Sequence, residues 1–348
     1  MHPLRFGLKL SQNATIDTLT TIWGIADDSG FDHCWNMDHF ASLGGDDTLD
    51  IFEAWTLLAG MAARTTRTRV GCSVTGNTYR HPAVLAKAAV TVDHRSGGRL
   101  EFGIGAGWAE NEHTMLGLRF GTARERADRL EEALPIIRSL WTQPRTTFTG
   151  KHYLLAEAVA EPKPVQTPHP PIWIGGVGRR RTLRMAAEHA AVWNAPGGSP
   201  EEVTELSAVL DGHCADVGRD PAEIRRSVQI RVPADVAGLV EQVAGFTAVG
   251  VTEIILIVAA DPVAQAERVA ALLPEAERPA FHLALGRFTR GRPYLLALSA
   301  DGAVRWSDDG RTPVGPVSEE HRASATAALL TRALTELKRQ RQKPQGVG

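Results

Sequence analysis

Strand-like apolar runs alternate with helical patterns along most of this 348-residue chain, and this alternation restricts the fold to the α/β class. Eight short apolar runs predict buried strands, at Arg5–Leu10, Phe31–Asn36, Arg69–Thr75, Leu100–Gly107, Pro171–Gly175, Ala190–Asn194, Arg226–Val232 and Glu253–Val258. Because a helical pattern separates one run from the next, consecutive strands are expected to be parallel. Eight such units fit a (β/α)8 TIM barrel. A doubly wound open sheet is the alternative, but no glycine-rich dinucleotide fingerprint follows the first strand.

Apolar residues at helical spacing place the intervening helices. The predicted ranges are Thr15–Ser29, Asp50–Arg64, Ala83–His94, Thr122–Trp141, Pro200–Val217, Asp235–Val249 and Pro262–Leu273, with one further helix after Gly175–Arg181. Phe52 is expected to face inward, and Val84 to share an apolar face with Leu85. Pro135 is expected to kink or restart its helix.

The alternation stops near Phe281, so we predict a barrel over residues 1–278 and a C-terminal extension over residues 279–348. The extension has three short strand-like runs and then an amphipathic helical pattern, at Leu283–Arg287, Tyr294–Ser299, Ala303–Trp306 and Ser318–Arg341.

The overall charge and the cysteines give only general limits. A formal net charge of -2 gives no reason to expect a nucleic acid or an acidic membrane as partner. The first residues run directly into a strand, and no apolar run reaches the length of a membrane span, so we predict no signal peptide and a cytoplasmic protein. The odd count of three widely spaced cysteines fits a reducing compartment.

Polar residues collect where the predicted strands end, which is the edge at which α/β folds bind ligands. Asp38 and His39 follow the second strand, where an imidazole can act as acid or base and Asp38 can fix its orientation. A structural Asp–His pair is the alternative reading. Asn77 and Tyr79 follow the third strand and are expected to line a pocket for a flat ligand.

Two glycine-rich segments also end strands. Gly103–Gly107 resembles a phosphate loop but is also compatible with close strand packing; Glu110–His113 follow it and could contact a ligand. Gly175–Arg181 lies at a strand-to-helix junction, where free N–H groups bind anions and three arginines add charge. Arginines on a solvated helix face are the alternative.

The scattered histidines form no metal-binding pattern, so no metal site is predicted. A Gly-x-Ser-x-Gly elbow is also absent, which excludes that serine-hydrolase signature.

The order of several motifs resembles the bacterial luciferase-like family. These motifs are Asp38–Phe40, Val74–Pro82, Asp93–Arg99, Gly105–Trp108 and Pro171–Gly176, and the resemblance extends from about Leu4 to Leu273. The chain most resembles the branch that uses the deazaflavin coenzyme F420. Its relatives include enzymes that use reduced FMN with dioxygen.

The resemblance implies a barrel whose mouth holds an isoalloxazine-type ring. It implies a non-proline cis peptide beneath the ring, which here is Ser73–Val74, and it assigns proton transfer to Asp38 and His39. The implied cofactor contacts are Thr75, Asn77, Gly107 and Asn111, with a phosphate loop of Gly175, Gly176, Gly178 and the adjoining Arg179.

One position departs from the family pattern. Sugar-phosphate dehydrogenases of this branch carry a catalytic glutamate directly after Gly-x-Gly, and this chain has Trp108 there. Tryptophan cannot act as a general acid, so an apolar wall and a less polar substrate are expected.

Three functions follow from this sequence. The leading hypothesis is an F420-dependent oxidoreductase that transfers a hydride to or from an activated C=C, C=N or carbinol carbon. The second is a reduced-FMN, dioxygen-dependent monooxygenase, and the third is a non-catalytic cofactor-binding subunit. The expected partners are a small-molecule or modified-peptide substrate and a second copy of the chain in a homodimer.

Overall fold

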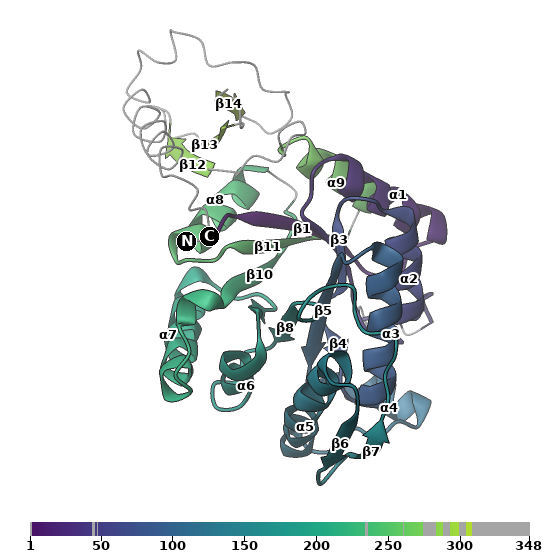
Figure 1. Cartoon of the computed structure of the whole chain (residues 1–348). Coiled ribbons are helices and arrows are strands. Elements are labelled where there is room, and N and C mark those ends of the chain that lie inside the picture. Colours follow the sequence, from purple (N-terminus) through teal and green to yellow (C-terminus); the bar gives the residue numbers. More distant parts are fainter. Residues whose placement is uncertain are drawn as a thin grey trace.

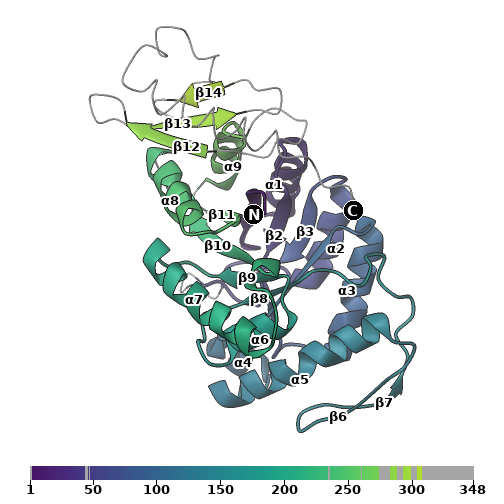
Figure 2. The same ribbon diagram turned by 60° about the vertical axis from the view of Figure 1, so that its left-hand side comes forward.

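The computed structural model describes residues 2–43, 46, 48–233, 236–259 and 261–273, together with three short strands nearer the C-terminus. Its centre is a closed barrel of parallel strands (Figures 1 and 2), in which β11 pairs with β1 to complete the ring. The barrel strands are β1 (Arg5–Leu10), β2 (His33–Asn36), β3 (Arg69–Cys72), β5 (Leu100–Gly105), β8 (Ile172–Gly175), β9 (Val192–Ala195), β10 (Arg225–Arg231) and β11 (Glu253–Val258). The predicted (β/α)8 fold is confirmed.

Helices surround the barrel (Figure 2), and all but the short α4 bury apolar residues against its outer surface. They are α1 (Ile16–Asp28), α2 (Ala54–Arg64), α3 (Pro82–Ser96), α4 (Glu110–Leu116), α5 (Ala123–Thr142), α6 (Thr182–His189), α7 (Pro200–Asp216), α8 (Val236–Ala248) and α9 (Pro262–Ala270). An antiparallel hairpin of β6 (Thr146–Thr149) and β7 (Leu154–Ala158) precedes β8.

Two predictions about the helices were wrong. Helix α2 begins at Ala54, because the Glu53 carboxylate caps it, and Phe52 therefore lies before the helix and is exposed. Val84 is also exposed, although Leu85 beside it is fully buried. Of the two outcomes expected at Pro135, a restart does not occur, since α5 is one helix from Ala123 to Thr142, and a kink stays a prediction.

Two segments around the third and fourth barrel strands also differ from prediction. The third strand is interrupted after Cys72 by a cis peptide bond between Ser73 and Val74, and resumes as the short β4 (Thr75–Gly76). Residues expected to form a polar loop after β5 form the short helix α4 instead. Both changes occur at the carboxyl edge of the barrel.

A three-stranded antiparallel sheet lies outside the barrel and against α8 (Figure 1). Its strands are β12 (Leu283–Arg287), β13 (Pro293–Leu298) and β14 (Val304–Ser307), which confirms the three predicted runs with small changes at their ends. The helix predicted over Ser318–Arg341 lies outside the described residues.

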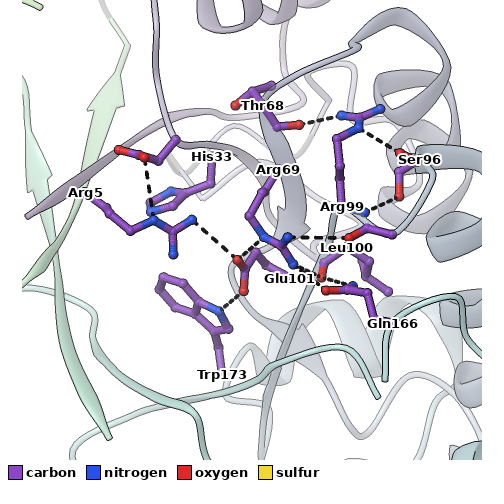
Figure 3. A network of polar contacts seen from close by, with 12 residues as sticks. Arg5, His33, Thr68, Arg69, Ser96, Arg99, Leu100, Glu101, Gln166 and Trp173 are labelled. Atoms are coloured by element: carbon purple, nitrogen blue, oxygen red, sulfur yellow. Dashed lines mark hydrogen bonds and ion pairs between the residues drawn. The ribbon is translucent and has the colours of Figure 1, made fainter. Parts of the chain in front are cut away.

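Buried charges close the amino end of the barrel (Figure 3). Glu101 and Glu253 are almost fully inaccessible, and Arg5 lies between them, 3.6 Å from one carboxylate and 3.2 Å from the other. Arg69 binds Glu101, and Arg225 binds Glu253 at 2.5 Å. The two buried carboxylates are therefore neutralised by arginines on neighbouring strands.

Aromatic side chains fill the barrel above this charged layer. The Trp35 and Trp173 rings meet edge to face with their centroids 4.6 Å apart, and Val192 and Ile255 pack beside them. The Trp173 indole donates a 2.6 Å hydrogen bond to Glu101, which ties this layer to the charges below. The interior is therefore a packed core, and a ligand can reach the barrel only from the carboxyl end.

Among the described residues, no helix combines the length and apolar character needed to cross a bilayer.

We predict that Glu253→Gln lowers the free energy of unfolding by about 3–5 kcal/mol, because it removes the buried carboxylate that binds Arg225 and one of the two that Arg5 contacts. Urea unfolding followed by circular dichroism measures this change. Glu205→Gln is the matched control, since Glu205 pairs with Arg179 on the surface, and should cost under about 1 kcal/mol. Equal losses in the two variants would contradict the assigned role of the charged layer.

The same carboxylate makes stability depend on pH. Burial opposes ionisation of Glu253, but His33, Arg5 and Arg225 outweigh it and hold its pKa below the ordinary glutamate value. The pKa is thus lower in the folded than in the unfolded chain, so this contribution is complete above about pH 4.3 and is lost as the pH falls through the folded value. Acid unfolding should be less steep in Glu253→Gln than in the wild type, and parallel acid titrations would test this.

Candidate active site at the barrel mouth

The candidate site lies at the carboxyl ends of the barrel strands, where the chain leaves β2, β4, β5 and β8. His39 follows β2, Tyr79 follows β4 and Trp108 follows β5. The structure brings these three together, since the ring centroids of His39 and Trp108 are 5.4 Å apart and Tyr79 shares a hydrogen-bond partner with His39.

That shared partner is Glu112 on α4, a fully buried carboxylate. Its Oε1 accepts a 2.9 Å hydrogen bond from Nδ1 of His39, and its Oε2 accepts one from the Tyr79 hydroxyl. A carboxylate can only accept, so the proton of a neutral His39 lies on Nδ1. The other ring nitrogen, Nε2, is left to face a ligand in the mouth.

Burial and hydrogen bonding fix the charge states of this group. Burial opposes ionisation of Glu112, but the hydrogen bonds from His39 and Tyr79 outweigh it and hold the pKa of the carboxyl below its usual value. Burial and the adjacent carboxylate raise the pKa of Tyr79. At neutral pH Glu112 is therefore an anion and Tyr79 a protonated donor.

Aromatic rings enclose this hydrogen-bonded group. Tyr79 stacks on His113 at 4.6 Å and meets the edge of Phe40 at 4.9 Å. Trp108 is 65% exposed and presents its ring to the mouth. An apolar wall at Trp108, which the sequence predicts, agrees with this placement.

The prediction that Asp38 orients His39 was wrong. Asp38 is buried and accepts two hydrogen bonds from Arg80, at 2.6 and 3.0 Å, and one from the Gly76 N–H. Arg80 also binds Glu53, the cap of α2. Asp38 therefore holds the loop after β4 and the start of α2 in place, and Glu112 takes the role expected of it.

The side chain of Val74 projects into the mouth over a floor of glycines. A Cβ atom on Gly175 would lie 2.7 Å from Val74 Cγ2, and one on Gly105 would lie 3.0 Å from it. Side chains at these two positions would push Val74 out of its place. The Ser73–Val74 peptide is cis, as the family resemblance implies. We call the Val74 side chain over the glycines of β5 and β8 the Val74 platform.

Several buried polar atoms near this platform have no partner among the described residues. These are the hydroxyl oxygens of Ser73 and Thr78 and the amide oxygen of Asn77. Buried polar atoms normally have partners, so the three fit a ligand that supplies hydrogen bonds. Thr75 is different, because its hydroxyl accepts a hydrogen bond from the Trp55 indole.

The other predicted contacts surround the same mouth. Gly107 has a positive φ of 84° at the turn after β5, and its carbonyl accepts a hydrogen bond from Arg126. Asn111 is exposed on the first turn of α4. Their contact with a ligand stays a prediction.

The predicted anion site is the loop between β8 and α6. Gly176 has a φ of 127°, a conformation that favours glycine, and α6 begins without a side-chain cap. The N–H of Gly176 already donates to the Asn194 carbonyl and that of Leu183 to the Gly178 carbonyl, so an anion would take N–H groups of the residues between them. The arginines are partly occupied elsewhere: Arg179 pairs with Glu205 at 2.7 Å, and Arg181 with Asp128 at 2.5 Å. The backbone is therefore better placed than the guanidinium of Arg179 to hold a phosphate.

Two residues of this site were not predicted from the sequence. Glu112 was noted only as one of several polar residues that could contact a ligand, since nothing in the sequence shows that α4 turns it toward His39. Lys9 is a buried cation on β1, and its Nζ donates a 2.7 Å hydrogen bond to the Ser73 carbonyl. A lysine in the middle of an otherwise apolar strand was the available signal.

No group of three or more His, Cys, Asp or Glu side chains in the described part of the chain is arranged to hold a metal ion.

Comparison with known proteins gives consistent results. The chain is 33% identical over 238 residues to the F420-dependent glucose-6-phosphate dehydrogenase of Kineococcus radiotolerans, covering 67% of this chain and 69% of the relative. It is 28% identical over 223 residues to the FMNH(2)-dependent dimethylsulfone monooxygenase of Pseudomonas putida, covering 62% and 60%.

Among solved structures, an F420-dependent secondary alcohol dehydrogenase in complex with an F420-acetone adduct matches with a TM-score of 0.66 at 19% identity, covering 74% of this chain and 93% of that one. This likeness confirms the fold. The family model described as luciferase-like monooxygenase matches residues 1–278. The chain therefore belongs to the luciferase-like monooxygenase family.

Proposed function

We propose that this protein is a coenzyme F420-dependent oxidoreductase that reduces an activated C=C or C=N bond of an organic substrate. The relative from Kineococcus radiotolerans is named for the same cofactor, which supports this choice. The observation that carries the proposal is His39 at the carboxyl end of β2, whose Nδ1 is held by buried Glu112, so that Nε2 is the ring nitrogen left for a ligand.

The residues at the mouth fit such a cofactor. A flat ring needs a rigid support, which Val74 provides, and hydrogen-bonding partners, which the unpartnered atoms of Ser73, Asn77 and Thr78 provide. The loop from Gly175 to Gly178 offers backbone N–H groups to its phosphate. When bound, the deazaflavin supplies the hydride donor or acceptor, and the protein supplies binding, orientation and protons.

The side chains of the site then supply the proton, orient the proton donor and limit access of water. Nε2 of His39 gives a proton to the reduced substrate or takes one from an alcohol being oxidised. Glu112 fixes the orientation of the ring through Nδ1, and Tyr79 holds Glu112 from its other oxygen. Trp108 covers the imidazole edge and limits access of water.

We do not propose a sugar phosphate as the substrate of this chain. Trp108 stands where the resemblance places their catalytic glutamate, so the acid used in that reaction is absent at this position. An electrophilic double bond needs one proton in addition to the hydride, which His39 alone can deliver. Reduction of such a bond is therefore the reaction that the site supports best.

A reduced-FMN monooxygenase is the second candidate, because the relative from Pseudomonas putida is named for that chemistry. A homodimer and a cytoplasmic location, both predicted from the sequence, remain predictions under either proposed function.

The first test is a pair of binding titrations with coenzyme F420 and with FMN, followed by fluorescence. F420 should bind with a Kd in the micromolar range or below, and FMN roughly tenfold more weakly or worse. His39→Asn is the control, because it should keep the affinity for F420 and lose hydride transfer. Preference for FMN would instead favour the monooxygenase, and binding of neither would favour a non-catalytic subunit.

A second test separates the roles of Glu112 and Asp38. Glu112→Gln should lower the rate of F420-dependent turnover by roughly 10–100-fold. The substitution removes the negative charge that orients His39 but keeps the shape of the side chain at position 112. Asp38→Asn should mainly lower the free energy of unfolding, by about 1–3 kcal/mol, through its hydrogen bonds to Arg80 and Gly76. Stopped-flow turnover and urea unfolding on both variants measure the two effects, and a larger turnover loss in Asp38→Asn would refute this division.

A further inference from the structure

Lys9 is a buried cation without a carboxylate partner in the described part of the chain. Its Nζ donates to the Ser73 carbonyl at 2.7 Å and to Oε1 of Gln229 at 2.8 Å, and both acceptors are neutral. An ammonium group has three donors, so these contacts leave one N–H to spare. Burial, with a contribution from the charge of Arg231, lowers the pKa of Lys9 to about 8.

Arg231 lies at the same level of the barrel as Lys9. Both residues are in register with Ile257 on the strand between them, so the three form one row across β10, β11 and β1. Adjacent strands are about 4.8 Å apart, which puts the two Cα atoms roughly 10 Å from each other. Two positions before Arg231, Gln229 reaches Lys9 inside the barrel. Since alternate residues share a face, Arg231 points toward the mouth.

The carboxylates of the mouth are already engaged. Asp38 binds Arg80, and Glu112 binds His39. Arg231 is exposed and has no ion pair with any described residue. Arg231 thus faces one side of the mouth, and the charge of buried Lys9 lies behind it. An anion held by the Arg231 guanidinium would offset the repulsion between the two cations.

We propose that Arg231, supported by the charge of buried Lys9 behind it, forms an anion subsite for a carboxylate or phosphate group of the organic substrate. The apolar body of that substrate would then lie toward exposed Trp108 on the opposite side of the mouth. This inference rests on the proposed function, since it names the substrate class of the same site: an apolar compound with one anionic end.

The test uses benzoate and phenyl phosphate as anionic probes and benzamide as the neutral one, each titrated calorimetrically into the F420-loaded protein. Both anions should bind at least about tenfold more tightly than benzamide. Arg231→Met should remove this preference, and Arg231→Lys should keep part of it. Arg145→Met, which removes an exposed arginine on the distant hairpin, is the matched control and should change nothing.

Four outcomes would overturn the proposal. Benzamide could bind as well as the anions, or none of the probes could bind. The preference could survive in Arg231→Met. Finally, Arg231→Met could weaken binding of F420 itself without changing the preference, which would assign the cations to the cofactor. Repeating the titrations without F420 separates this result from failure of the proposed function, because binding of F420 and preference for anions are then measured independently.

Discussion

The barrel depends on the neutralisation of two carboxylates, Glu101 and Glu253, at its amino end. Each is fully enclosed, and an unpaired charge in such a place would cost several kcal/mol. Arg5 contacts both, so the strands β1, β5 and β11 must come together in one register for the charges to cancel. The tryptophans above are tied to this layer by the bond from Trp173 to Glu101, and they in turn form the base under the mouth.

The mouth itself is divided into two halves of different chemistry. On the side of β2 and β5, His39 and Glu112 form a hydrogen-bonded pair enclosed by aromatic rings. On the side of β1 and β10, buried Lys9 binds Gln229 and the Ser73 carbonyl. Ser73 and Val74 lie between the halves, so this short segment contacts the cation below it, while a ligand in the mouth would lie above it.

Much of the fold could be predicted because it depends on local patterns. The apolar runs of β1 and β11 were located to the residue, since a buried parallel strand is apolar at nearly every position. Phe52 was misplaced because the cap at Glu53, rather than hydrophobicity, decides where α2 begins. Glu112 could not be assigned, because its role depends on the direction in which α4 leaves β5. The role of Asp38 was mispredicted for a related reason. Because Asp38 is next to His39 in sequence, a contact between them was expected, but Asp38 binds Arg80, forty-two residues away in sequence.

The closed amino end has a consequence for the order of events in a reaction. With charges and tryptophans blocking one end, everything that binds must enter and leave by a single opening. A ring lying on Val74 would sit at the bottom of that opening, with any second molecule stacked above it. The lower molecule can then leave only after the upper one has gone. The geometry therefore favours compulsory-order kinetics, in which the cofactor binds first and is released last.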